Sequence, residues 1–162
     1  RVYTNEDLVG CELGGALKNV IALAAGMAEG LDTGDNARAA LITRGLAEMT
    51  RLGVALGGDP MTFAGLAGMG DVMATCMSSQ SRNRWVGEQV GRGAAPDRVL
   101  AGMDQVAEGV RTATVACELA ASVAMEVPVA EGVRSVFDDG RSPTEVWSAL
   151  MARRTGPEVA TT

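Results

Sequence analysis

The sequence contains no histidine, and this absence narrows its chemistry more than any other feature of its composition. Ser-His-Asp and Cys-His catalysis both need an imidazole base, and the usual zinc sites include histidine ligands. Aromatic residues make up only 3% of the chain, and the net charge is −6. General nucleic-acid binding requires a basic surface. We therefore expect no histidine-based catalysis, no metal site and no nucleic-acid partner.

Cysteine and long apolar runs are also scarce. Cys11, Cys76 and Cys117 are odd in number and far apart, which favours a reducing compartment over a disulfide framework. We find no signal-peptide pattern, and the longest apolar run, Val20 to Ala28, is about half of the ~20 residues that a membrane-spanning helix needs. These features predict a cytoplasmic protein without integral membrane contact.

The composition that remains is globular, with 47% hydrophobic and 21% charged residues over 162 positions. This length suffices for one domain that buries about two thirds of its unfolded surface. The first residue is arginine rather than methionine, and Arg1-Val2-Tyr3 resembles the end of a β-strand. We therefore expect the chain to be the C-terminal part of a longer protein.

Apolar residues recur at helical spacing through nearly the whole sequence, and no convincing strand follows Tyr3. Caps such as Asp59-Pro60 and the box Ser142-Pro143-Thr144-Glu145 mark helix starts. The pattern predicts an all-α domain, a compact bundle of six to eight helices over residues 1–155, and a disordered tail over residues 156–162. The expected helices cover about 6–31, 37–52, 61–66, 71–76, 84–91, 108–125, 128–137 and 146–153, with a connector at 91–96.

Glycine and methionine indicate how these helices pack. The 21 glycines, with so few aromatic residues, predict that the helices approach one another closely. We expect the nine methionines mainly to fill gaps in the core.

Three polar islands interrupt the apolar helical pattern: Lys18 with Asn19, Asp71 with Thr75, and the run from Ser81 to Arg84. A lysine among small and apolar residues is the usual arrangement where an amine takes part in proton transfer. A side chain that reaches along the surface to water gives the same pattern. For Asp71, the alternative is that it only caps the following helix.

The third island has the composition of an anion site. Arg82 offers a guanidinium fork, Asn83 an amide and Ser81 a hydroxyl, beside the N-terminus of a helix expected near Arg84. Phosphate is the natural guest, although an exposed loop with solubilising arginines is the alternative. A lysine, a carboxylate, a hydroxyl and a phosphate cradle together suit a small phosphorylated alcohol.

Several short motifs occur in order along the chain: Glu12-Leu-Gly-Gly-Ala-Leu-Lys18-Asn19, Gly34-Asp35-Asn36, Ala40-Leu-Ile-Thr-Arg-Gly-Leu-Ala-Glu-Met, Gly68-Met-Gly-Asp71, Thr75-Cys76, Ser81-Arg-Asn-Arg84 and Glu108-Gly109. Each short piece is weak by itself. In combination they resemble the C-terminal, substrate-binding half of bacterial NAD(P)-dependent sn-glycerol-3-phosphate dehydrogenase, and the resemblance covers nearly all of residues 1–155.

The resemblance implies an oxidoreductase that interconverts dihydroxyacetone phosphate and sn-glycerol 3-phosphate with NAD or NADP, for phospholipid synthesis. It implies a two-domain dehydrogenase whose N-terminal Rossmann domain, and a second lysine of the family, are absent here, so we expect the isolated chain to be inactive. The implied catalytic residue, the proton donor and acceptor, is Lys18. The residues implied to bind substrate are Lys18, Asp71, Thr75, Ser81, Arg82 and Asn83, and those implied to contact the cofactor are Arg82, Val106 and Glu108.

Two other interpretations are open on the sequence. The first is a catalytically silent helical interaction or dimerisation module that keeps the helical scaffold but no site. Separately, a Gly- and Ala-rich helical surface suits a homodimer. The second is the helical half of another hydroxyacid or sugar-phosphate dehydrogenase. The Ser81–Arg84 run favours a phosphate-bearing substrate over a carboxylate-only one.

Overall fold

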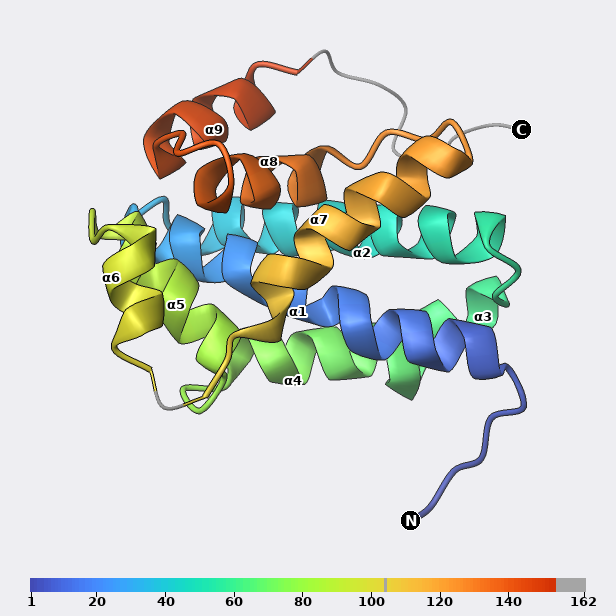
Figure 1. Cartoon of the computed structure of the whole chain (residues 1–162). Helices are drawn as coiled ribbons and strands as arrows, with labels where there is room; N and C mark the ends of the chain where they lie inside the picture. Colours follow the sequence, from blue (N-terminus) through green and yellow to red (C-terminus); the bar gives the residue numbers. More distant parts are fainter. Residues whose placement is uncertain (104, 154–162) are drawn as a thin grey trace.

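The computed structural model describes residues 1–103 and 105–153, and these form nine α-helices and one π-helical turn without a strand (Figure 1). The all-α prediction is confirmed. The elements are α1 (Leu8–Gly30), α2 (Asp35–Ala55), α3 (Pro60–Ala64), the π-helical turn η1 (Leu66–Gly70), α4 (Asp71–Met77), α5 (Arg82–Gly91), α6 (Pro96–Ala101), α7 (Glu108–Ser122), α8 (Pro128–Phe137) and α9 (Pro143–Met151).

The helix count exceeds the six to eight expected, because α6 follows directly after the stretch taken as a connector. Its proline lies at the first helical position, where a missing N–H is harmless. Residues 1–7 form neither helix nor strand, so the strand-like opening has no counterpart here. The tail expected over 156–162 lies outside the described residues.

Several helices begin where the capping residues predicted. The Asp7 carboxylate accepts a hydrogen bond from Gly10 N at 2.8 Å, and Asp59 accepts from Met61 N at 2.8 Å. At α9, the Ser142 hydroxyl and the Glu145 carboxylate each accept from the other residue's backbone N–H. Each such cap satisfies a donor that the first helical turn leaves without a partner.

The core is built around α1, which contacts α2, α3, η1, α4, α5, α7 and α8. Its stretch from Val20 to Ala28 is buried throughout. By length and composition alone, α1 could cross a membrane, and among the described residues no other helix meets that test. The short apolar run therefore belongs to a longer apolar helix, but this helix is covered by its neighbours as the centre of the bundle (Figure 1).

Glycines let α1 and α5 touch through their main chains. A Cβ on Gly26 of α1 would clash with the carbonyl of Arg84, and a Cβ on Gly87 of α5 would clash with the carbonyl of Leu23. Only glycine permits two helices to lie this close at both points. The prediction of close helix packing is therefore correct.

The methionines do not follow the expectation that they fill the core. Met27 and Met49 are buried, but five others are exposed: Met61, Met69, Met73, Met77 and Met151. Met69, Met73 and Met77 recur every four residues along η1 and α4, which places them along one side of this helical segment. Composition could not separate core methionines from surface ones, because this unbranched side chain suits either environment.

Candidate functional site

Lys18 and Asp71 form the centre of the candidate site. Lys18 lies in the middle of α1 and Asp71 is the first residue of α4. Lys18 Nζ donates to Asp71 Oδ2 at 2.6 Å, and their side chains are 24% and 37% exposed. The amine is therefore half-buried and paired with a carboxylate rather than extended alone into water. It also gives Asp71 a partner other than the backbone, and no side-chain cap is formed at the start of α4.

The glycines before Lys18 shape the space around it. A Cβ on Gly14 would lie 2.6 Å from the carbonyl oxygen of Ala67, so this glycine lets η1 approach α1. A Cβ on Gly15 would meet nothing within 4 Å, so the helix surface one turn before Lys18 faces open space. The amine therefore lies where α4 approaches α1 on one side and a small molecule has room on another.

Thr75 lies one turn after Asp71 on α4, on the same side of the helix. Its hydroxyl donates to the Asp71 carbonyl at 2.7 Å, inside the helix. The oxygen keeps its acceptor capacity toward a ligand. Cys76, which follows it, is buried, and burial raises the pKa of its thiol to about 12. Cys76 therefore stays protonated and packs the core, because a thiolate would be needed for chemistry.

Asn83 links three site segments. Its Nδ2 donates to Asn19 Oδ1 at 3.0 Å, and its Oδ1 accepts from Gly109 N at 3.0 Å. Asn19 follows Lys18 on α1, Asn83 is in the first turn of α5, and Gly109 is in the first turn of α7. Asn83 is buried, so a hydrogen-bonded amide at this position fixes where the three segments meet.

The N-terminus of α5 carries the rest of the predicted anion site. Ser81 is its cap, with the hydroxyl accepting from Arg84 N at 3.3 Å. Arg82 is exposed, and its Nη1 donates to Gln105 Oε1 at 2.7 Å. Arg84 points elsewhere, because its Nη2 pairs with Glu29 Oε1 at 2.7 Å on α1. Of the two arginines in the run, Arg82 is the one placed to meet a ligand.

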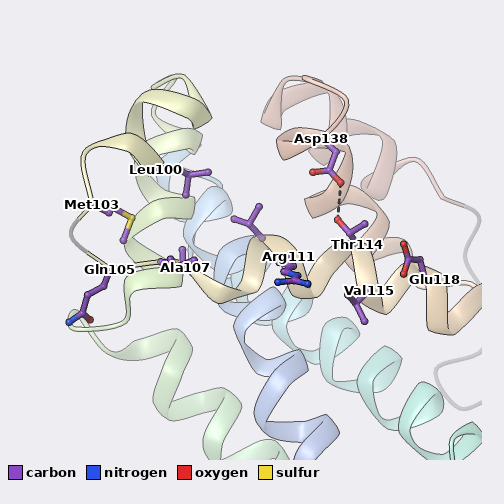
Figure 2. A pocket seen from close by; sticks show the side chains of 11 residues that line it. Leu100, Met103, Gln105, Ala107, Arg111, Thr114, Val115, Glu118 and Asp138 are labelled. Carbon is purple, nitrogen blue, oxygen red and sulfur yellow. Dashed lines mark hydrogen bonds between the residues drawn. The ribbon is translucent and has the colours of Figure 1, made fainter.

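The predicted cofactor-contacting positions lie before and at the start of α7. Val106 is 76% exposed, and Glu108 is the first residue of the helix. Val106 and Gln105 line a groove of about 760 Å³ that continues along α7 toward the end of α8. Figure 2 shows the residues that line this groove, with Arg111 on α7 near its middle. The Thr114 hydroxyl donates to Asp138 Oδ2 at 2.8 Å. The groove starts at the residue that holds the Arg82 guanidinium.

No structural role was predicted from the sequence for two residues that form hydrogen bonds in the site. Asn19 was part of the first polar island, but its link to Asn83 crosses 64 positions and has no local signal. Gln105 lies in an irregular segment between α6 and α7, where spacing predicts nothing about partners. Both are contacts between distant segments, which only the assembled fold brings together.

A third residue without a predicted role is Glu48, a buried carboxylate in α2 away from the candidate site. Both of its carboxylate oxygens lie 2.9 Å from the Val129 N–H at the start of α8. Burial raises the pKa of Glu48 to about 7, and the hydrogen bonds from the backbone of Val129 and Ala130 oppose this shift. The carboxylate therefore satisfies a helix start whose own N-cap, Val127, provides no side-chain acceptor.

Comparison with known proteins identifies the family to which the chain belongs. The model of the C-terminus of NAD-dependent glycerol-3-phosphate dehydrogenase matches residues 7–148. The chain belongs to this family. The NAD(P)⁺ glycerol-3-phosphate dehydrogenase of Parafrankia sp. (strain EAN1pec) is 58% identical over 158 residues, covering 98% of this chain and 47% of that protein. The enzyme of Geobacillus thermodenitrificans is 58% identical over 153 residues, covering 94% of this chain and 45% of that protein.

Solved structures agree. The crystal structure of glycerol-3-phosphate dehydrogenase from Coxiella burnetii has a TM-score of 0.91 and 41% identity, over 94% of this chain and 47% of that one. This chain thus spans about half the length of the glycerol-3-phosphate dehydrogenases that it matches. The resemblance inferred from the sequence motifs is confirmed, and the comparisons do not favour a silent interaction module.

Proposed function

We propose that the full-length protein interconverts dihydroxyacetone phosphate and sn-glycerol 3-phosphate with NAD or NADP, and so supplies the backbone of glycerophospholipids. The observation that carries this proposal is the 2.6 Å contact between Lys18 Nζ and Asp71 Oδ2. It joins residues 53 positions apart, within the bundle that also places Arg82 at the start of α5. The relatives named above are glycerol-3-phosphate dehydrogenases.

Lys18 acts as the proton donor and acceptor in this proposal. Reduction of the ketone needs a proton at the carbonyl oxygen, and oxidation of the alcohol needs its removal. An ammonium at this position supplies the proton and stabilises the negative charge that develops on oxygen. Lys18 is the only lysine in the chain, so no other amine in these residues can replace it.

Asp71 and Thr75 hold the reacting end of the substrate. The Asp71 carboxylate keeps the Lys18 amine in one position and leaves its other oxygen for a substrate hydroxyl. Thr75 offers a hydroxyl oxygen one turn further along α4. Positioning of this kind matters because small displacements from a reactive geometry lower the rate steeply.

Arg82 binds the phosphate, together with Ser81 and the amide edge of Asn83. A guanidinium donates two parallel hydrogen bonds to a phosphate, and the free N–H groups of a helix start add to the attraction. The phosphate does not react, so its binding energy serves to hold the carbonyl beside Lys18. The buried Asn83 amide already has two partners, and most of its contribution is to keep α5 beside α1.

The nicotinamide cofactor would supply the hydride when bound. The residues of this chain that fit it are Arg82, Val106 and Glu108, which lie at the starts of α5 and α7 where the groove of Figure 2 begins. An arginine suits the charged part of a dinucleotide, and the exposed Val106 suits an apolar ring face. Within the described residues there is no Gly-rich turn between a strand and a helix, so most cofactor contacts fall to the rest of the protein.

The decisive experiment replaces Lys18 in the full-length enzyme. Lys18→Ala should lower kcat by roughly 10²–10⁴-fold, the usual contribution of general acid–base catalysis. Lys18→Arg is the matched variant, because arginine keeps a charge beside Asp71 but does not give up a proton near neutral pH. We expect a comparable loss for both. Turnover within a few-fold of the unmodified enzyme in Lys18→Arg would show that only the charge at this position matters, and the assignment of Lys18 as proton donor would be wrong.

A further inference from the structure

A polar cavity lies between α8 and α9, away from the candidate site. Its volume is about 320 Å³, and three arginines line it: Arg134 on α8, Arg141 in the turn between the two helices and Arg153 just after α9. Figure 1 shows α8 and α9 on the opposite side of α1 from α4, the helix that carries Asp71. None of the described residues that line this cavity, called here the α8–α9 cavity, belongs to the candidate site or to the groove of Figure 2.

Guanidinium groups that converge from separate segments are typical of a site for an anion. Each guanidinium presents a planar pair of donors that fits two oxygens of a phosphate or a carboxylate. The sequence carries a net charge of −6, with 14 lysines and arginines against 20 acidic residues. Three of these cations around one small cavity are therefore a local excess that the overall composition does not predict.

The hydrogen-bond donors of these arginines are only partly used. Arg134 Nη2 lies 3.7 Å from Asp139 Oδ2, too far for a good hydrogen bond, and Arg134 Nε is buried without a hydrogen-bond partner in the described part of the chain. Arg153 pairs with Glu126, but both side chains are exposed, and water weakens such pairs. Arg141 is exposed and forms no ion pair with any residue that the structure describes.

The buried Nε of Arg134 is the atom that points to a ligand. Folded proteins leave few buried donors unsatisfied, and an exception beside a cavity indicates a bound ion or water. The guanidinium is charged, so a missing partner costs more free energy here than it would for a neutral donor. An anion in the α8–α9 cavity would attract this guanidinium and supply the acceptors that it lacks.

The other lining residues indicate the charge and size of the anion. Glu131 and Asp139 also line the cavity, so two carboxylates oppose its three arginines and one positive charge remains in excess. This excess suits a single phosphate group, which carries about −1.5 to −2 at neutral pH, and not a polyphosphate. Val146 and Leu150 of α9 provide an apolar wall, and the volume lies at the lower end of the range for ligand pockets. A phosphate on a short carbon skeleton matches these features.

We propose that the α8–α9 cavity binds a small phosphate monoester outside the candidate catalytic site. The three arginines donate to the phosphate oxygens, and the carbon skeleton contacts Val146 and Leu150. The bound anion would also hold α8 and α9 together, because its ligands come from both helices and from the turn between them. Neither Lys18 nor Arg82 takes part, so binding here is independent of the dehydrogenase activity proposed above.

Nuclear magnetic resonance of the arginine Nε–Hε groups tests this binding in the full-length protein. The protein carries isotopically labelled arginine and is titrated with ethyl phosphate at constant ionic strength, which keeps the screening of charge fixed. The signals of Arg134, Arg141 and Arg153 should shift together and saturate with one Kd of about 1 mM or below. The Arg82 signal reports separately on phosphate bound at the candidate site. No saturable shift at the arginines of the cavity would overturn the proposal.

Arg141→Gln is the decisive variant, and Arg44→Gln is its matched control. Arg44 is an exposed arginine of α2 that is not among the residues lining the cavity, and both variants lose one charge. In Arg141→Gln, the Kd measured at Arg134 and Arg153 should rise at least about tenfold, because a charge-assisted hydrogen bond is lost. In Arg44→Gln it should not change. Neither variant should alter the turnover of glycerol 3-phosphate. An unchanged Kd in Arg141→Gln would contradict the proposal.

Two further probes define the class of ligand. Inorganic phosphate has no carbon skeleton to contact Val146 and Leu150, so it should bind roughly fourfold or more weakly than ethyl phosphate. Acetate carries a single charge and should shift the three arginine signals little at the same concentration. Equal affinity for inorganic phosphate and ethyl phosphate would contradict the assignment to a phosphate ester. Equal shifts with acetate would mean a general cationic surface and would overturn the proposal.

Discussion

At the scale of single residues, the contact between Lys18 and Asp71 turns two weak sequence signals into one site. Each residue had an ordinary explanation, a surface lysine or a helix cap, and neither explanation accounts for the 2.6 Å pairing. The residue types and the three polar islands could be predicted from sequence. Asn83 as the buried link to Asn19 and Gly109 could not, because an amide between arginines has the same local pattern whether it meets a ligand or another helix.

Arg82 is tested by a conservative change in the full-length enzyme. Arg82→Lys keeps the charge but loses the two-pronged donor geometry. A lost charge-assisted hydrogen bond is worth about 1.5–3 kcal/mol, so kcat/KM for glycerol 3-phosphate should fall roughly tenfold to hundredfold. The loss should nearly vanish with glycerol, which has no phosphate. Arg92→Lys, at the other end of α5 and paired with Glu88, is the control and should have little effect. An equal loss with both substrates would point to the cofactor or the fold instead.

Because of Glu48, the free energy of unfolding should decrease as the pH rises toward neutrality. Its pKa is about 7 in the folded protein against an ordinary value of 4.5, so the folded state binds more protons between these values. The stabilisation is therefore complete below about pH 4.5 and is lost as the pH rises through about 7. Each pH unit in this window lowers the free energy of unfolding by up to about 1.4 kcal/mol.

Urea unfolding of the 162-residue chain across this pH range measures the effect. Glu48→Gln keeps an oxygen for Val129 N but cannot ionise, so its free energy of unfolding should vary less with pH than that of the unmodified chain. The difference between the two profiles isolates Glu48 from other titrating groups. Parallel profiles would mean that the pKa of Glu48 is the same in the folded and the unfolded protein.

At the scale of elements, the caps and the 3.6-residue period predicted most helices close to their observed bounds. The exceptions are short. Residues 96–101 offer too few turns for a period to emerge. The π-helical turn η1 fills the gap between the helices expected over 61–66 and 71–76. The exposed face of Met69, Met73 and Met77 was assigned to the core because apolar character alone does not say which surface covers a residue.

The glycine contacts between α1 and α5 predict opposite effects for one substitution at two sites. Gly26→Ala adds a Cβ against the carbonyl of Arg84 and should lower the free energy of unfolding by about 1–3 kcal/mol, as overpacking usually does. Gly15→Ala lies in the same helix with nothing within 4 Å, and should raise it by about 0.5–1 kcal/mol. Urea unfolding of both variants measures this. Equal changes at both sites would mean that the close contact of Gly26 with Arg84 does not decide the outcome.

At the scale of the whole molecule, the family and the all-helical fold were both inferred from sequence, the first from motifs in order and the second from periodicity. The division of labour between the two halves of the protein was inferred in the same way. This division predicts how the chain behaves by itself. A lysine and a phosphate-binding site cannot transfer hydride without a bound nicotinamide.

The 162-residue chain should therefore show negligible dehydrogenase activity. The absorbance of reduced nicotinamide, followed with glycerol 3-phosphate in excess, measures it against the full-length enzyme at the same concentration. The far-ultraviolet circular dichroism of the chain, which should be strongly helical, is the control for folding. Robust turnover by the folded chain would mean that these residues bind the cofactor unaided, and the two-half arrangement would be wrong.

Main-chain contact between α1 and α5 fixes the backbone spacing of the two residues that we propose to hold opposite ends of the substrate. Lys18 is carried by α1 and Arg82 begins α5, and neither helix can slide without driving a glycine into a carbonyl. The backbone separation of these two positions is therefore set by main-chain contact, and only the Lys18 and Arg82 side chains can adjust it. If the two side chains hold opposite ends of the substrate as proposed, this fixed backbone separation favours phosphorylated alcohols within a narrow range of lengths.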